Sequence, residues 1–240
     1  MADSPVAAPL ATAPPRGRAR ELAEIFIAYA LIMMVIWTPR EAQRILWWVA
    51  AAGVLAIIYF SFDGWAAAGM RARNLGRSFW IVVAALVLSA VAIAIAARIG
   101  TLHLPRTLIA FVGTYIAYAI WSGVQQFLLQ GLFLARLLRI VPRASLAALA
   151  AAILFSSAHL PSPFLAPITL VWGFIACLLF LKYRNLYPLA LAHAILGITI
   201  ALTVPGPVDH NMRVGLGYLT YDPHHPHHRH LPVVDPSPRE

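Results

Sequence analysis

Long apolar runs alternate with short polar or proline-containing breaks along most of this chain. Seven of these runs approach the roughly 20 residues that a helix needs to cross the hydrocarbon core of a bilayer. We therefore predict an all-α integral membrane protein, a polytopic bundle of about seven transmembrane helices. The predicted spans are residues 23–38, 45–62, 79–97, 107–138, 144–159, 164–183 and 186–204.

The fourth run, residues 107–138, is longer than one crossing requires. Two arrangements fit it equally well. It forms either one tilted helix that projects beyond the bilayer or two helices that are broken near Trp121-Ser122-Gly123.

The two ends of the chain differ from its middle and divide it into three parts. Residues 1–20 are rich in Pro, Ala and Arg, which is typical of a disordered arm. Residues 21–205 form the predicted membrane domain. Residues 206–240 are a tail rich in His and Pro, and its prolines favour a disordered tail over a transition-metal site with regular ligand spacing.

The composition supports the membrane assignment. The chain is 61% hydrophobic and 11% charged, with a mean hydropathy of +0.76. Soluble domains average about 45–50% apolar and about 25% charged residues. The net charge of +9 does not indicate nucleic-acid binding, because the basic residues lie between apolar runs and form no basic stripe. Membrane lipid is the expected surrounding partner.

Lys and Arg residues gather at alternate breaks between the runs. The N-terminal arm and the breaks after the second, fourth and sixth spans carry three, three, three and two of them, eleven in all, whereas the breaks after the first and third spans carry four. Because cytoplasmic loops are enriched in Lys and Arg, the N-terminus is predicted to be cytoplasmic. The expected location is a bacterial cytoplasmic membrane.

A polar cluster interrupts the apolar body. Gln125, Gln126 and Gln130 lie in the fourth run, and no Asp or Glu occurs in residues 64–208. His159 and His193 lie within two later runs. Polar groups inside a membrane are costly, so they mark either a working site or a contact between helices.

Three local sequences resemble the CPBP family of intramembrane proteases, also called the Abi or CAAX prenyl protease 2 family. The family carries Glu-Glu-x-x-x-Arg on one helix, Phe-x-x-x-His on the next, and His followed four residues later by Asn or Asp on another. Here the corresponding stretches begin at Gln125, Phe155 and His193 in the same order. The resemblance covers roughly residues 75–202 and implies an intramembrane endopeptidase fold.

The first motif is altered at each of its ionisable positions. Gln125 stands at the first glutamate, Gln126 at the second and Gln130 at the arginine. In the family the first glutamate is taken to be the general base that activates water together with the histidine of motif two. A carboxamide is not basic near neutral pH, and general-base assistance is worth about 10² to 10⁴ in rate.

The second and third motifs are partly retained. Phe155 and His159 match motif two, and His193 matches the histidine of motif three. Gly197 stands where the family has the Asn or Asp that is thought to help stabilise the oxyanion. A glycine provides no side-chain donor, so a second part of the catalytic machinery is weakened.

The neutral amides can also be explained as helix contacts. Gln126 and Gln130 are four residues apart and share a helix face, which suits hydrogen bonds to His159 and His193 on neighbouring helices. A polar pocket that binds a ligand or peptide fits the same residues. Glu24 is the carboxylate considered as a substitute base, and it is expected to lie too near the cytoplasmic end.

Three hypotheses follow. The favoured one is a protease-fold protein with impaired hydrolysis that acts as a binding or assembly component. The second is an active endopeptidase that uses His159 and His193 on a peptide or prenylated substrate. The third is a structural subunit of a larger membrane complex. No cofactor is predicted, and no metal is expected at the two histidines because zinc would need further ligands and amides are poor ones.

Overall fold

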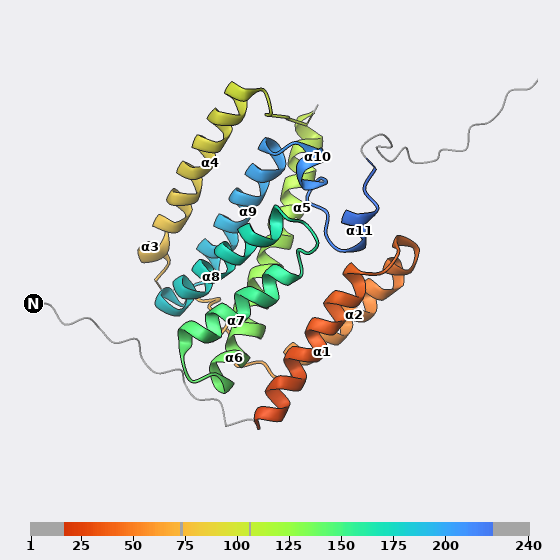
Figure 1. Cartoon of the computed structure of the whole chain (residues 1–240). Helices are drawn as coiled ribbons and strands as arrows, with labels where there is room; N and C mark the ends of the chain where they lie inside the picture. Colours follow the sequence, from red (N-terminus) through yellow and green to blue (C-terminus); the bar gives the residue numbers. More distant parts are fainter. Residues whose placement is uncertain (1–16, 73, 106, 223–240) are drawn as a thin grey trace, which may run out of the picture.

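The computed structural model describes residues 17–72, 74–105 and 107–222 of the 240-residue chain (Figure 1). Every regular element in these ranges is helical, which confirms the all-α class. In chain order the helices are α1 (Arg18–Ile36), α2 (Arg40–Phe60), α3 (Leu75–Ser78), α4 (Trp80–Ile99), α5 (Leu108–Phe127), η1 (Leu128–Leu134), α6 (Ala135–Ile140), α7 (Ala144–Ser157), α8 (Leu165–Tyr183), α9 (Tyr187–Thr203), α10 (Gly206–Asp209) and α11 (Leu216–Leu219).

Several helices have the composition of membrane spans. α2, α8 and the stretch Leu75–Ile99 are each long and apolar enough to cross a bilayer, and α7 and α9 are shorter apolar helices. The chain is therefore a multi-pass membrane protein. The count of seven spans and the cytoplasmic N-terminus remain predictions.

The overlong fourth run is one continuous helical rod made of α5, η1 and α6. The helix passes through Trp121 and Gly123 without a break, so the single-helix alternative is correct. The departure from α-helical geometry lies further on, in the seven π-helical residues of η1. Such wider turns are rare and often occur at functional sites.

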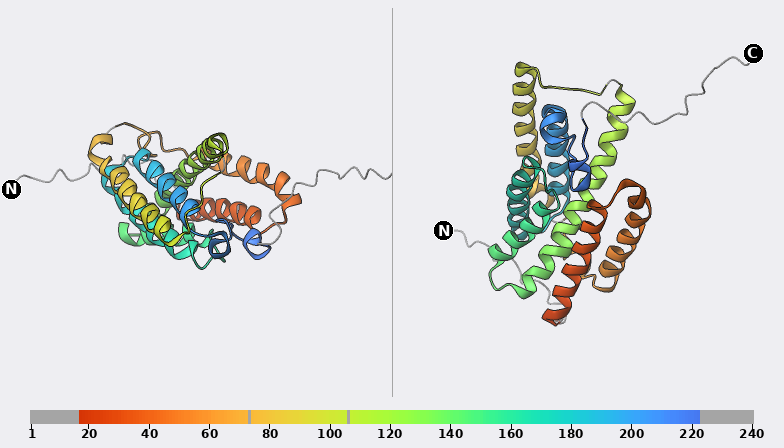
Figure 2. Two further views of the ribbon diagram at one scale, coloured as in Figure 1. Left: turned by 90° about the horizontal axis from the view of Figure 1, so that it is seen from above. Right: turned by 45° about the vertical axis from the view of Figure 1, so that its right-hand side comes forward.

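The rod separates the other helices into two groups (Figure 2). On one side α9 packs between α4 and α5, while α7 packs on α8 and both contact η1. On the other side α1 pairs with α2 and contacts the rod at α6. Tyr29 of α1 also bonds to Ser157 at the end of α7, with 2.6 Å between the hydroxyl oxygens.

Small side chains allow α7 and α8 to pack closely. Ala148 and Ala152 of α7 are fully buried, and a Cβ atom added to Gly173 of α8 would lie 3.4 Å from the Cα of Ala152. Close approach at small residues is a common mode of helix packing in membranes. It fixes the short connection between the two helices, where His159 lies.

The structure extends into both predicted terminal segments. α1 begins at Arg18, inside the predicted arm of residues 1–20. Residues 206–222 of the tail contain α10 and α11, and the Gly215 amide donates to the Leu160 carbonyl at 2.7 Å. The rest of the arm and the His/Pro-rich stretch after Asp222 lie outside the described residues.

Candidate functional site

Four polar side chains recur every four residues along the rod. Tyr118, Ser122, Gln126 and Gln130 therefore share a face, and it faces α9. The last three are completely buried. Ser122 satisfies its own hydroxyl by donating to the Tyr118 carbonyl at 2.9 Å. The face is thus a buried polar column within an apolar bundle.

The two buried glutamines join the rod to α9. Gln130 Nε2 donates to Gln126 Oε1 at 3.2 Å, and Gln126 Nε2 lies 3.2 Å from His193 Nδ1. An amide that donates to Nδ1 requires the neutral imidazole, because the protonated ring has no acceptor. The expected bond between a motif-one glutamine and His193 is therefore present, and each member of this chain of bonds is uncharged.

His159 lies beside this chain without a hydrogen bond to the glutamines. It is half-buried, and its Nδ1 lies 2.8 Å from the Phe155 carbonyl, which only a ring N–H can satisfy. The Phe155 ring packs edge-on against both imidazoles, with centroids 4.9 Å from His159 and 5.8 Å from His193. The structure thus brings the two predicted histidines together across one aromatic ring.

Gly197 and Tyr118 are complementary in shape. A Cβ atom added to Gly197 would lie 1.9 Å from the Tyr118 hydroxyl oxygen. The phenol therefore occupies the space in which an Asn or Asp side chain at this position would begin. Sequence reasoning missed Tyr118, although its four-residue spacing from Ser122 and Gln126 was a usable signal.

Gln125 is the predicted site residue that stands apart. Its side chain is half-buried, and it makes no hydrogen bond to another residue in the described part of the chain. The position at which the resemblance expects the general base is thus the least engaged of the three glutamines.

Two buried polar atoms near His193 have no hydrogen-bond partner among the described residues. They are Gln130 Oε1, an acceptor, and Trp172 Nε1, a donor. The Trp172 ring lies 6.1 Å from the His193 ring, and Gln130 lies beside the buried Cys177 thiol. Unpaired buried polar groups are rare and call for a water or a ligand. The site thus retains unused hydrogen-bonding capacity.

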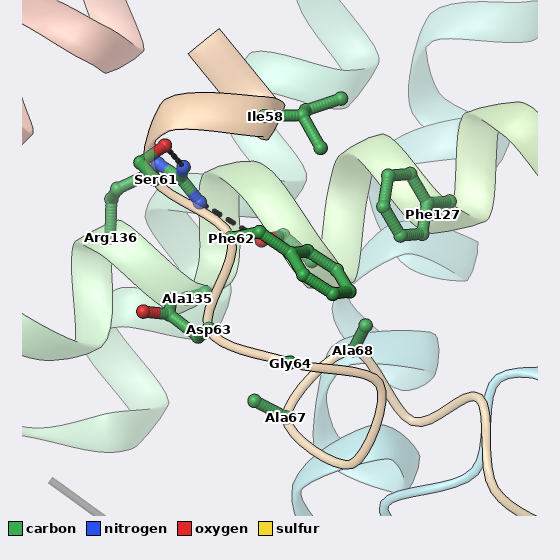
Figure 3. A pocket seen from close by; sticks show the side chains of 11 residues that line it. Ile58, Ser61, Phe62, Asp63, Gly64, Ala67, Ala68, Phe127, Ala135 and Arg136 are labelled. Atoms are coloured by element: carbon green, nitrogen blue, oxygen red, sulfur yellow. Dashed lines mark hydrogen bonds between the residues drawn. The ribbon is translucent and has the colours of Figure 1, made fainter. Parts of the chain in front are cut away.

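Glu24 forms ion pairs away from this site. Its carboxylate accepts from Arg20 at 2.9 Å and from Arg136 at 3.0 Å. Arg136 is ten residues beyond Gln126, which is about 15 Å along a helix at 1.5 Å per residue. It also bonds to Ser61, which points toward it, and to the Gly131 carbonyl at 2.9 Å (Figure 3). The Glu24 carboxylate is thus paired with Arg136 and does not lie at the histidines as a substitute base.

Arg136 belongs to an ionic cluster at the start of α1. Its neighbour Arg139 pairs with Glu21 at 2.8 Å and also with Asp63, which follows α2. A small cavity of about 20 Å³ lies beside Arg136, enough for one water molecule. The ionic cluster, defined as Glu21, Glu24, Asp63, Arg136 and Arg139, connects α1, the end of α2 and the rod.

An apolar groove of about 690 Å³ lies between the α1–α2 hairpin and the rod. On the rod it is lined by Ile120, Val124 and Phe127, which lie on a different face from Gln126. The Trp47 and Trp121 rings meet edge to face at 5.8 Å and connect the groove's two walls.

In residues 17–72, 74–105 and 107–222, no three His, Cys, Asp or Glu residues come together in a group that could hold a metal ion. The absence of a metal at His159 and His193 stays a prediction.

Residues 108–199 match the family model described as type II CAAX prenyl endopeptidase Rce1-like. They belong to the Rce1-like family. The Rce1-like segment covers less than half of the chain, begins at the first residue of α5 and ends within α9, so it includes the three glutamines and both histidines. No curated protein and no solved structure matches the chain.

Proposed function

We propose that this Rce1-like membrane protein is proteolytically impaired and acts as a binding or assembly component. The observation that carries the proposal is the buried bond between Gln126 and His193. Gln126 stands where the family resemblance expects a glutamate, and its neutral amide is hydrogen-bonded to Nδ1 of His193. Gln125, at the position where the resemblance expects the general base, is an amide as well. An amide cannot accept the proton of an attacking water, so general-base assistance from motif one is lost.

Binding is favoured by two further features. The unpaired Gln130 Oε1 and Trp172 Nε1 offer an acceptor and a donor near His193. The groove between the hairpin and the rod offers an apolar volume of about 690 Å³, which suits a lipid-like or prenyl chain. A peptide or prenylated protein can therefore be held without being cleaved.

Hydrolysis is tested with the purified full chain and a prenylated C-terminal peptide that reports cleavage. We expect no turnover above buffer. Turnover that disappears in the His159→Ala variant would overturn the proposal and establish a histidine-based endopeptidase instead. His159 suits this test because its ring has no hydrogen bond to the glutamine chain.

A variant that restores the charged residues of motif one tests whether their loss is the cause of the impaired hydrolysis. Gln125→Glu, Gln126→Glu and Gln130→Arg together return the charges that the family resemblance expects. If motif one limits catalysis, this variant gains cleavage by roughly 10² or more over the native chain. Thermal unfolding in detergent must accompany the assay, because Gln126 and Gln130 are fully buried and the new charges are costly there.

Assembly is tested by extraction in mild detergent followed by mass measurement of the intact complex. A stoichiometric partner supports an assembly role. Recovery of free monomer under conditions that preserve known membrane complexes would contradict it. This measurement is informative whatever the cleavage assay gives.

A further inference from the structure

Hydrogen bonds join the loop before α3 to the turn between α8 and α9. The Leu186 amide donates to the Gly69 carbonyl at 2.9 Å, and the Tyr187 hydroxyl donates to the Met70 carbonyl at 3.0 Å. Asn74 Nδ2 donates to the carbonyl of Tyr183, the last residue of α8, at 3.2 Å. Two segments more than a hundred residues apart in sequence therefore form one surface.

Among the described residues this surface carries four cations, which we call the basic patch. The loop and α3 contribute Arg71 and Arg77, and the end of α8 and the following turn contribute Lys182 and Arg184. Arg71, Arg77 and Lys182 are exposed. Arg184 is half-buried, with its guanidinium 5.0 Å above the Phe180 ring.

Aromatic side chains accompany the basic patch. Trp80 Nε1 donates to the Tyr183 hydroxyl at 3.1 Å, and Lys182 Nζ lies 5.2 Å from the centre of the Tyr183 ring. Trp and Tyr concentrate where a membrane protein crosses from hydrocarbon to headgroups. These aromatic residues favour a position of the basic patch at the depth of the lipid headgroups.

The protein provides the basic patch with no counter-charge in its described part. Residues 64–208 contain no Asp or Glu. The carboxylates of the ionic cluster are bonded to Arg20, Arg136 and Arg139. Burial lowers the pKa of the Arg184 guanidinium, and no carboxylate opposes that shift. The four cations thus have no carboxylate partner among the described residues and are available to an external anion.

We propose that the basic patch binds the phosphate of anionic phospholipid headgroups at the cytoplasmic membrane surface. Guanidinium and ammonium groups are the usual phosphate ligands, and clustered basic residues at a membrane end attract anionic lipid. Arg71 and Arg77 lie outside the Rce1-like segment, whereas Lys182 and Arg184 lie inside it. The inference is independent of whether the protein hydrolyses peptides.

The test titrates phosphatidylglycerol into the detergent-solubilised full chain and counts bound lipids by intact-complex mass measurement. The Arg77→Gln, Lys182→Gln double variant is expected to bind roughly 30-fold more weakly, from about fivefold for each basic residue at an anionic surface. Arg77→Gln alone should give about fivefold. The matched control, Arg44→Gln with Arg98→Gln, makes the same charge change at exposed positions elsewhere and should bind like the native chain.

Several results would overturn the inference. One is equal binding by the native chain and the Arg77→Gln, Lys182→Gln variant. Another is an equal loss of lipid affinity in the control variant, which would show that binding depends on the overall charge of the protein and not on the basic patch. Phosphatidylcholine binding as tightly as phosphatidylglycerol, or millimolar inorganic phosphate displacing the lipid, would exclude a headgroup site.

Discussion

Gln126 is the side chain through which the rod and α9 are hydrogen-bonded. Gln126→Leu keeps the volume but removes both of its bonds, so His193 Nδ1 and Gln130 Nε2 become unpaired in a buried site. Each unpaired group costs about 1–3 kcal/mol, and we expect a clearly lower Tm in detergent. Gln125→Leu is the matched control: the same change one residue away, at a half-buried side chain, should leave Tm nearly unchanged.

The close packing of Gly197 against Tyr118 leaves no room for a side chain at position 197. Gly197→Ala places a methyl group 1.9 Å from the phenol oxygen, and overpacking of this kind typically costs about 1–3 kcal/mol. Thermal unfolding should show the loss in the native background and a much smaller loss in a Tyr118→Leu background. Gly123→Ala has open space around it and should be neutral or stabilising.

Part of this site could be predicted from single residues. The four-residue spacing of Gln126 and Gln130 gave their shared face, and the motif order gave His193 as a partner. The role of Tyr118 depends on the absence of a side chain at Gly197, 79 positions later, which spacing within one helix does not reveal. Gln125 is the opposite case. It is the same residue type as its neighbour Gln126, but its side chain makes no hydrogen bond in the described part of the chain.

At the scale of elements, Arg136 connects the ionic cluster to the π-helical part of the rod. It is 2% exposed, pairs with Glu24, and donates to the Gly131 and Leu132 carbonyls of η1. Arg136→Leu should cost up to about 3–5 kcal/mol, because it leaves the largely buried Glu24 carboxylate with only the exposed Arg20 as its ion-pair partner. Thermal unfolding in detergent provides the measurement.

Two further variants test whether the loss of stability comes from the ion pair between Glu24 and Arg136. Glu24→Leu combined with Arg136→Leu should be more stable than Arg136→Leu alone, since the carboxylate that lost its buried partner is removed as well. Arg143→Leu removes an exposed arginine near the same end and should change Tm little. If Arg143→Leu proved as damaging as Arg136→Leu, general charge loss and not the ion pair would explain the effect.

Hydropathy predicted where helices occur but not how the rod is built. Residues 107–138 form one long, mainly apolar run, and hydropathy cannot distinguish α from π geometry over seven of its residues. The pairing of Glu24 with Arg136 joins residues 112 positions apart, so nothing local in the sequence indicates it. This ion pair is a tertiary contact, and it anchors α1 to the rod.

At the scale of the molecule, the Rce1-like segment and the α1–α2 hairpin share one hydrophobic core, to which Ile25, Ala28 and Val54 of the hairpin contribute, and a few polar contacts. α1 is held by the ionic cluster and by the bond from Tyr29 to Ser157. α2 reaches the rod through Ser61 and through the contact of Trp47 with Trp121. Between these points the apolar groove remains. A membrane ligand in this groove would contact the rod on a face other than that of the buried polar column.

The orientation of the chain in the membrane can be measured by cysteine labelling, because the sequence contains a single native cysteine. Cys177 is fully buried, so a membrane-impermeant maleimide should not label the native chain. Arg44→Cys and Arg98→Cys are expected to react in intact cells, whereas Arg77→Cys should react only after permeabilisation, because the Lys and Arg distribution places it in the cytoplasm. The reverse pattern would mean that the N-terminus is external. Labelling of Arg77→Cys and Arg98→Cys from the same side would mean that α4 does not cross the bilayer.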